Sequence, residues 1–264
     1  SKVARYSANF TPSTSALTSD NDTIVLIQGD GGAFADSSVG GTTHNVTPTN
    51  DVRHSSGYGS TGSGYAGGIA PAMPFSSNGK STGSIGAYFD GGNDSAIKID
   101  ALPTNLLPEL NLGNNTDFTI DFWVWMVQVS SSQSLISRRH NKSSGAASAW
   151  WIEIVSGAAP VALRLRTQEN ATTITSSNVI YPYRWHHITL NRDVSNSNLI
   201  TLYVDATSVG TYNSAAIDME DGTVDQDQDF LLSGAYSSGN TIVDELNGYI
   251  DSFRFKKGSC LTPT

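Results

Sequence analysis

The stretch Asp117–Gln128, DFTIDFWVWMVQ, alternates with a period of two and decides the class of fold. One face of it is wholly apolar: Phe118, Ile120, Phe122, Val124 and Met126. The other face carries Thr119, Asp121, Trp123, Trp125 and Val127. Such alternation, with β-branched and aromatic residues and no Pro or Gly, predicts a β-strand. Because a long edge strand would invite aggregation, we expect a central strand that lines a core.

The composition around this stretch is that of many short strands joined by polar turns. The chain has 264 residues, including 25 Gly, and only 15 % are charged. That length suits one large all-β domain or two small ones, and no long segment shows a helical period. A sandwich or barrel is therefore expected.

Charge and hydropathy exclude several partners. The formal net charge is −9 and the pI is about 4.8, so the surface repels nucleic acid and anionic membranes. No apolar run approaches the length that spans a membrane, and we expect no membrane insertion. The single cysteine, Cys260, cannot form an intrachain disulfide.

Thirteen strands in addition to the central one are predicted from local patterns. They cover residues 21–28, 44–47, 85–89, 96–99, 134–137, 149–155, 161–166, 172–175, 184–191, 200–204, 208–212, 229–233 and 248–255. Asp205 and Ala206 suit a hairpin turn. In the last strand the buried positions jump from Ile250 to Phe253, which predicts a β-bulge near Asp251 and Ser252.

Residues 53–84 are rich in Gly and Ser and contain almost no aliphatic residues. One interpretation is a surface excursion or flexible linker. The other is a binding loop that presents Tyr58, Tyr65 and Phe75, because loops of this length are often functional.

Four segments resemble the laminin G-like, concanavalin A-like jelly-roll domains, most closely those in virion structural proteins of marine bacteriophages. In order they are FDGGND (Phe89–Asp94), DFTIDFWV (Asp117–Val124), WHHITLNRD (Trp185–Asp193) followed by ITLYVDATSVGT, and GYIDSFRF (Gly248–Phe255). The resemblance implies two packed antiparallel sheets at 21–256, with an insertion at 53–84. Tails at 1–20 and 257–264 flank them. Members of this family mostly bind glycans, proteins or Ca²⁺, and a minority of proteins with the fold cleave glycans.

The two ends of the chain are similar to each other. Ser1–Thr14, SKVARYSANFTPST, resembles the tail that follows the last strand in such phage proteins, and Phe255–Thr264 is a looser copy. The chain is then one unit of a tandem or polymeric array with tails docking on neighbours, or a piece processed from a longer virion protein. The alternative is that ends rich in Thr, Pro and Ser are simply common.

Catalytic residues are hard to find in this sequence. A glycosidase needs two carboxyl groups about 5–9 Å apart, but no strand carries acids at alternate positions. Asp121 and Glu153 each stand alone, and no nucleophile elbow is present. We interpret His186 and His187 as structural hydrogen-bonding residues at a strand start. We therefore expect a non-enzymatic protein.

A calcium site is one interpretation of three aspartates. Asp30 and Asp36 lie in a Gly-rich turn, and Asp251 lies at the expected bulge. Carboxylates and turn carbonyls are oxygen ligands that Ca²⁺ accepts, and the family resemblance implies that these positions lie near each other. The alternative is that Asp30 and Asp36 cap turns through their own backbone and that Asp251 binds bulge amides.

Outward-facing aromatic residues are the candidate ligand contacts. By parity, Trp123 and Trp125 point away from the core face, and Trp151 and Glu153 point away from the face of Trp150. Together these residues predict an aromatic patch on an outer, concave sheet surface, where rings cover the apolar faces of sugars. The alternative is that the 53–84 loop or a neighbouring subunit covers the rings.

The sequence thus predicts an all-β, antiparallel β-sandwich jelly roll. The expected role is a virion structural or adhesion module, found in the virion or outside the cell. Its expected partners are a host-surface glycan or neighbouring virion proteins, with oligomeric or tandem display. A secreted carbohydrate-binding or carbohydrate-cleaving domain is the alternative.

Overall fold

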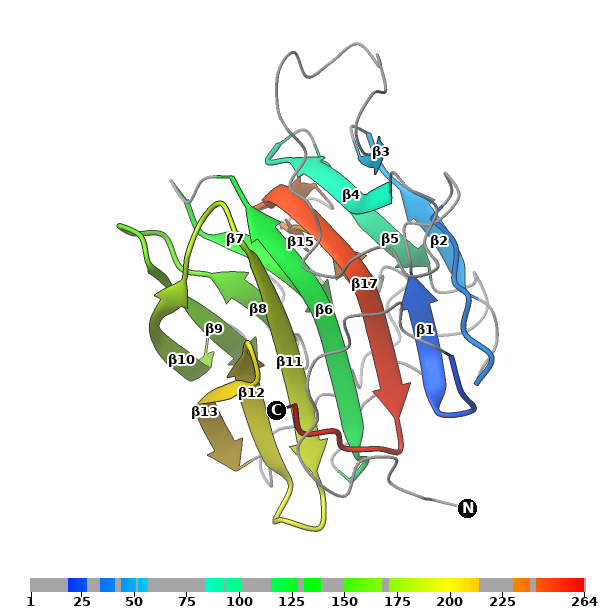
Figure 1. The fold of residues 1–264 in the computed structure, drawn as a ribbon, viewed down its shortest axis with the longest axis vertical. Coiled ribbons are helices and arrows are strands. Elements are labelled where there is room, and N and C mark those ends of the chain that lie inside the picture. The colour runs from blue at the N-terminus through cyan, green and yellow to red at the C-terminus, as the bar shows by residue number, and fades with distance from the viewer. Residues whose placement is uncertain are drawn as a thin grey trace.

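The computed structural model describes residues 19–27, 34–40, 44–50, 52–56, 84–92, 94–100, 115–127, 131–138, 150–167, 171–213, 230–237 and 241–263. Within these ranges every regular element is a β-strand, and the strands form two large antiparallel sheets and one small ribbon (Figure 1). No helix among the described residues is long and apolar enough to cross a membrane. The predicted antiparallel β-sandwich is confirmed.

The eight-stranded sheet contains the strand that the sequence marks as central. Its order is β13 (Thr207–Asn213), β12 (Leu199–Val204), β11 (Trp185–Asp193), β6 (Phe118–Met126), β17 (Asn247–Lys257), β4 (Ser84–Asp90) and β3 (Arg53–Ser56), and β1 (Thr23–Ile27) also pairs with β17. The N-terminal half of β17 pairs with β4, and its C-terminal half pairs with β1. Since β6 lies between β11 and β17, its predicted central position is confirmed.

The seven-stranded sheet forms the second layer. Its order is β10 (Ala171–Ile180), β9 (Val161–Thr167), β8 (Trp150–Ile154), β7 (Gln133–Arg138), β14 (Phe230–Leu232), β5 (Ile97–Asp100) and β2 (Asn45–Pro48). β15 (Ala235–Tyr236) and β16 (Ile242–Val243) form a two-stranded ribbon that pairs with neither large sheet. Tyr236 and Ile242 of the ribbon form a small buried cluster with Ala96 and Leu231, which attaches the ribbon to the second layer.

Three strands were not predicted: β3, β15 and β16. β3 opens the segment that we expected to be an insertion at 53–84, so the start of that segment belongs to the sheet. The rest of it, 57–83, including Tyr58, Tyr65 and Phe75, lies outside the described residues. The two-residue strands β15 and β16 are too short to carry a periodic pattern.

The core lies between the two sheets and is built by the alternating positions. Every core-facing side chain of β6 is fully buried. Aromatic rings connect the layers: the Phe122 and Phe253 centroids are 6.4 Å apart, those of Phe253 and Phe230 are 5.4 Å apart, and those of Phe230 and Trp150 are 5.7 Å apart. These four rings belong to β6, β17, β14 and β8, so both sheets share one core.

A β-bulge interrupts β17 where the sequence predicts it. Asp251 pairs with Trp123 but Arg254 pairs with Asp121, so β17 has one residue more than β6 over this interval. Ser252 adopts a φ of 52°. The extra residue brings both Ile250 and Phe253 into the core, and the prediction is confirmed.

The C-terminal tail packs on the outer face of the eight-stranded sheet. Thr119 donates a hydrogen bond to the carbonyl oxygen of Ser259 (3.0 Å) and accepts one from the amide of Leu261 (2.8 Å). The side-chain amide of Asn191 donates to the carbonyl oxygen of Leu261. Since Leu261 is buried, this tail docks on its own chain and covers the Thr119 end of that face.

Candidate binding surface

A row of aromatic residues crosses four strands on the outer face of the eight-stranded sheet. In backbone register, Trp185 of β11 is the partner of Trp125 of β6, Trp125 is the partner of Tyr249 of β17, and Tyr249 is the partner of Tyr88 of β4. We call these four residues the aromatic row. All four residues are half-buried.

The rings of the aromatic row support one another. The centroid of Tyr249 lies 5.5 Å from that of Trp125, 5.1 Å from that of Tyr88 and 6.4 Å from that of Trp185. Trp125 also packs edge-on against Tyr183, at 5.8 Å. Tyr183 is 66 % exposed and extends this surface to the end of the sheet. Contacts of this kind hold side chains in place before a ligand arrives.

A buried histidine positions the turn that carries Tyr183. His186 accepts a hydrogen bond from the amide of Tyr181 at Nε2 (3.0 Å), which leaves Nδ1 to donate to Asp205 (2.8 Å). The amide of Tyr183 donates to the carbonyl oxygen of Met126 (2.9 Å). These bonds fix the 181–184 turn beside β6, and the structural interpretation of His186 is confirmed.

Asp205 belongs to the predicted hairpin between β12 and β13, which is confirmed. Asp205 and Ala206 both have positive φ, 49° and 65°, as a two-residue hairpin turn requires. Burial opposes ionisation of Asp205. The hydrogen bonds from His186 and the His187 amide, with the charge of Arg184, outweigh that effect and lower the pKa of Asp205.

Glycine allows the close approach of two strands next to the aromatic row. Gly248 precedes Tyr249 in β17, and a Cβ at this position would collide with the carbonyl oxygen of Trp125. The residue type at 248 is therefore set by the backbone contact that brings Tyr249 beside Trp125.

Below the aromatic row lies a charged cluster that is closed to solvent. Arg254 binds Asp121 in a bidentate manner, with both N–O distances 2.9 Å, and Nε2 of His187 lies 3.5 Å from the same carboxylate. Burial works against the charge of Asp121, but Arg254 and His187 outweigh it and lower the pKa of Asp121. A carboxylate held ionised in this way does not supply a proton near neutral pH, so Asp121 does not fit the role of a general acid.

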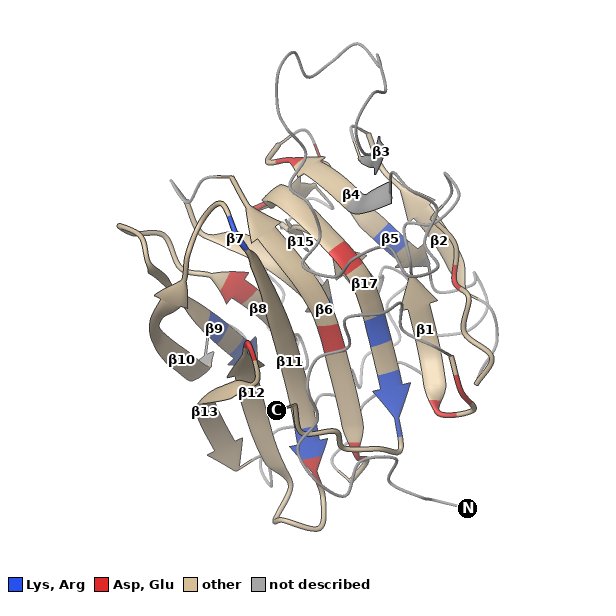
Figure 2. Ribbon diagram, viewed as in Figure 1, with Lys and Arg blue, Asp and Glu red and all other residues tan. Residues whose placement is uncertain are grey.

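Trp123 joins the aromatic row to the charged cluster. It is half-buried, and its ring centroid lies 5.0 Å from that of His187. Figure 2 shows the acidic residue of β6 beside a basic residue of β17 in the middle of this sheet, with a further basic residue toward the lower end of β17. The outer face thus has an aromatic end and an ion-paired part that the tail borders.

Trp151 and Glu153 do not belong to this surface, and the prediction of one patch with Trp123 and Trp125 is wrong. β8 lies in the seven-stranded sheet, so these residues project from the opposite side of the sandwich. They are 2 % and 4 % exposed. The indole N–H of Trp151 donates to Glu153 (3.2 Å), Arg164 binds the same carboxylate, and the Arg166 guanidinium lies 5.2 Å from the Trp151 ring centre.

The aspartates predicted to bind calcium are held by protein donors where the structure describes them. Asp36 accepts hydrogen bonds from the backbone amides of Leu26, Ser38 and His44 and from the His44 side chain (2.8 Å). Burial would raise the pKa of Asp36, but these bonds outweigh it and lower the pKa.

Asp251 and Asp30 leave the calcium prediction open. Oδ1 of Asp251 accepts a hydrogen bond from the amide of Ser252 at 2.6 Å, and Asp30 lies outside the described residues. Within the described part of the chain, no three His, Cys, Asp or Glu side chains are grouped so as to hold a metal ion. Calcium binding stays a prediction.

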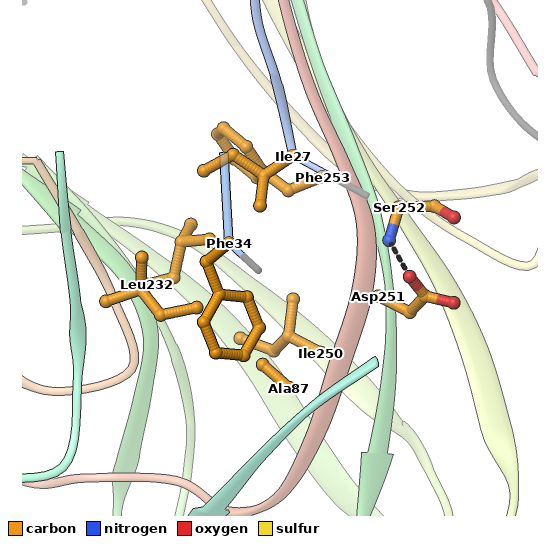
Figure 3. A pocket seen from close by; sticks show the side chains of 9 residues that line it. Ile27, Phe34, Ala87, Leu232, Ile250, Asp251, Ser252 and Phe253 are labelled. Atoms are coloured by element: carbon orange, nitrogen blue, oxygen red, sulfur yellow. Dashed lines mark hydrogen bonds between the residues drawn. The ribbon is translucent and has the colours of Figure 1, made fainter. Parts of the chain in front are cut away.

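A small cavity lies on the inner side of the bulge in β17. Figure 3 shows Phe34, Ile27, Leu232, Ile250 and Phe253 around it, with the Asp251 carboxylate turned to the opposite side of the strand. The volume of the cavity is about 10 Å³, which is the lower limit for one water molecule. It is too small for a sugar or a peptide side chain.

Sequence reasoning found Trp123 and Trp125 but missed Tyr88, Tyr183, Trp185 and Tyr249. The parity of Trp185 and Tyr249 within their strands was a usable signal, since each is next to a residue of the opposite face that is buried, His186 and Ile250. Their alignment across four strands depends on register, which no local pattern specifies.

Two antiparallel sheets packed around one shared core are the architecture of a jelly-roll domain. The family model described as the concanavalin A-like lectin/glucanases superfamily matches residues 90–263, and the chain belongs to this superfamily. The jelly-roll fold and the laminin G-like resemblance are confirmed. No curated protein matches the sequence at a significant level.

Several solved structures share the fold at low sequence identity. The binding domain of Paraclostridial Mosquitocidal Protein 1 aligns with a TM-score of 0.59 and 14 % identity, over 91 % of this chain and 50 % of that one. A structure of botulinum neurotoxin type C, whose cell entry depends on two ganglioside molecules, aligns at 0.54 and 16 %, over 91 % and 49 %.

A third structure is the binding domain of botulinum neurotoxin DC in complex with rat synaptotagmin II, which aligns at 0.55 and 15 %, over 91 % and 49 %. The chain spans about half the length of these solved structures. The similarity therefore establishes a shared fold. The ganglioside and synaptotagmin ligands are properties of those proteins.

Proposed function

We propose that this chain is a non-enzymatic adhesion module of a bacteriophage virion, such as a fibre, tail or capsid-decorating domain. It binds a host-surface glycan or a neighbouring virion protein, and it acts on the virion or outside the cell. The observation that carries the binding role is the aromatic row, four half-buried rings in register across four strands. A contiguous group of partly exposed aromatic residues is typical of partner-binding sites.

Three further points support a binding role. The chain belongs to a superfamily whose description includes lectins. Structures with the same fold belong to receptor-binding proteins described with gangliosides or synaptotagmin II. The strand carboxylates considered for catalysis, Asp121 and Glu153, are both held by arginine side chains. A non-enzymatic module accounts for all three.

The test of the binding surface is substitution of its central ring. Trp125→Ala should weaken binding to glycans or virion proteins captured by the wild-type chain by roughly 10-fold or more, the value of one or two aromatic contacts. Tyr212→Ala is the matched control, because Tyr212 is an exposed aromatic residue on the edge strand β13. Binding measured by biolayer interferometry that is equal for wild type and Trp125→Ala would contradict the proposed surface.

The virion assignment needs a separate test. It rests on the resemblance of four segments to phage virion proteins, and it predicts oligomers or filaments in light scattering and electron microscopy. No reducing sugar should be released from algal or bacterial polysaccharides. A monomer with saturable glycan binding would instead favour a secreted carbohydrate-binding domain, and sugar release would favour a glycan-cleaving one.

A further inference from the structure

The aromatic row has a direction, and that direction restricts the shape of its ligand. Its four residues are direct Cα partners, so the row runs perpendicular to the strands from β11 to β4. Adjacent strands are about 4.8 Å apart, so three steps span roughly 14 Å. A line of this length suits an extended ligand with several rings.

The rings of the aromatic row are not coplanar. The ring planes of Trp125 and Tyr249 meet at 75°, those of Tyr88 and Tyr249 at 51°, and those of Trp185 and Tyr249 at 57°. Tyr183 is also edge-on to Trp125, at 74°. A flat crystalline polysaccharide face needs coplanar rings, whereas a single chain can turn each sugar to the ring beneath it.

The charges around the aromatic row disfavour an anionic ligand. Asp90 lies two paired positions beyond Tyr88 on β4, opposite Asn247. The same end of the sandwich carries Asp94 and Glu245, and the amide of Asp94 donates to Glu245 at 3.1 Å. Burial raises the pKa of Glu245, and the nearby charges of Asp94 and Asp244 add to that effect. Carboxylates accept hydrogen bonds from sugar hydroxyls and repel uronates, sulfates and sialic acids.

One arginine, Arg184, stands at the Trp185 end of the aromatic row and does not reverse this balance. It lies in the turn next to Trp185, and its guanidinium is 3.3 Å from Asp205 and 5.0 Å from the ring centre of Tyr181. Among the described residues named here the carboxylates outnumber this arginine, and the whole chain has a net charge of −9.

From these observations we propose that the aromatic row binds an internal segment of a single, uncharged glycan chain lying across the strands. This inference rests on the proposed function and adds the class of ligand. Four rings in a line can contact successive units along a chain, whereas a terminal sugar would reach only one or two of them.

The experiment is a length series measured by isothermal titration calorimetry on the full chain. The probes are soluble neutral β-glucan, mannan and agarose oligosaccharides of about two to eight units, which bracket the roughly 14 Å length of the row. Each added unit should strengthen binding by roughly 3–10-fold until the row is filled, after which affinity should be constant. Microcrystalline cellulose and sialylated or sulfated glycans should bind more weakly than the best neutral oligosaccharide.

Two variants separate the proposal from the function on which it rests. Tyr88→Ala, at the end of the row, should weaken binding of long oligosaccharides and leave the shortest ones unchanged, whereas Trp125→Ala should weaken all lengths. If Trp125→Ala removes glycan binding but affinity does not depend on length, or anionic or crystalline glycans bind best, the glycan class is wrong and the binding surface stands. If no glycan binds, the glycan inference is wrong, and the proposed function then requires that virion proteins bind the wild-type chain more tightly than Trp125→Ala. If Trp125→Ala weakens binding to neither glycans nor virion proteins, both are wrong.

Discussion

The two outer faces of the sandwich both present tryptophans, but in different surroundings. On the eight-stranded sheet, Trp125 packs edge-on between Tyr183 and Tyr249 and stays half-buried. On the seven-stranded sheet, Trp151 is 2 % exposed, donates its indole N–H to Glu153 and lies under Arg166. An outward-facing tryptophan is thus a candidate ligand contact only where its polar and aromatic neighbours leave part of it exposed.

The same contrast holds for the buried charges of the two faces. Asp121 is fully enclosed and bound by both nitrogens of one guanidinium edge. Glu153 is shared by Arg164 and Arg166, whose side chains are 23 % and 19 % exposed. Removing a partner from an enclosed pair leaves a buried charge, whereas a solvent-accessible arginine can turn to water. Loss of Arg254 should therefore cost more stability than loss of the Glu153 charge.

The largest effect is expected for Arg254→Met. The substitution keeps the apolar bulk but leaves the Asp121 carboxylate in the protein interior without its main partner. We expect a loss of about 3–5 kcal/mol in the free energy of unfolding near neutral pH. Urea unfolding followed by tryptophan fluorescence measures this loss.

The pH dependence of Arg254→Met checks its cause. In the wild type the pKa of Asp121 lies below its ordinary value of 3.8, so its stabilising contribution is complete above that pH and is lost as the pH falls through the folded pKa. Without Arg254, burial raises the pKa of Asp121, and protonation removes the unpaired charge. The deficit should therefore shrink between about pH 7 and about pH 4.5; a deficit that does not change with pH would point to lost packing.

A smaller effect is expected for Glu153→Gln on the opposite face. The amide still accepts a hydrogen bond from Trp151, and the two arginines gain water. We expect a loss of about 1–2 kcal/mol in the same unfolding measurement. A loss as large as that of Arg254→Met would show that exposure of the arginines does not separate the two clusters.

The smallest effect on stability is expected for Tyr183→Asn. Tyr183 is 66 % exposed and has a φ of 63°, a conformation that asparagine tolerates. The free energy of unfolding should change by less than about 0.5 kcal/mol, while partner binding should weaken because the exposed ring next to Trp125 is gone. Unchanged binding would limit the surface to the four residues of the row.

Much of the fold was predictable because alternation along a strand is local. The apolar face of β6, its central position and the hairpin at Asp205 followed from residue order. So did the bulge after Asp251, since the step from Ile250 to Phe253 breaks the period of two. The short strands β15 and β16 were missed because two residues carry no period.

The candidate site was only partly predictable. Alternation along the strands correctly predicted that Trp123, Trp125 and Trp151 face away from the core. The prediction that all three share one surface was wrong, because Trp151 belongs to the other sheet. Tyr88 was missed although it faces outward from a predicted strand. Its value as a contact comes from Tyr249 beside it, more than 150 positions away in the sequence.

By itself, the sequence determined that this chain is a β-sandwich and which side of each long strand faces the core, because burial imposes a period of two on neighbouring residues. Only the tertiary structure decided which sheet each strand joins and which outward residues meet. Those relations depend on pairing between distant segments, where one position of register moves every side chain to the opposite face. Trp125 and Trp151 have the same local signal, but distant partners place Trp125 in a half-buried aromatic row and bury Trp151 against Glu153 and Arg166.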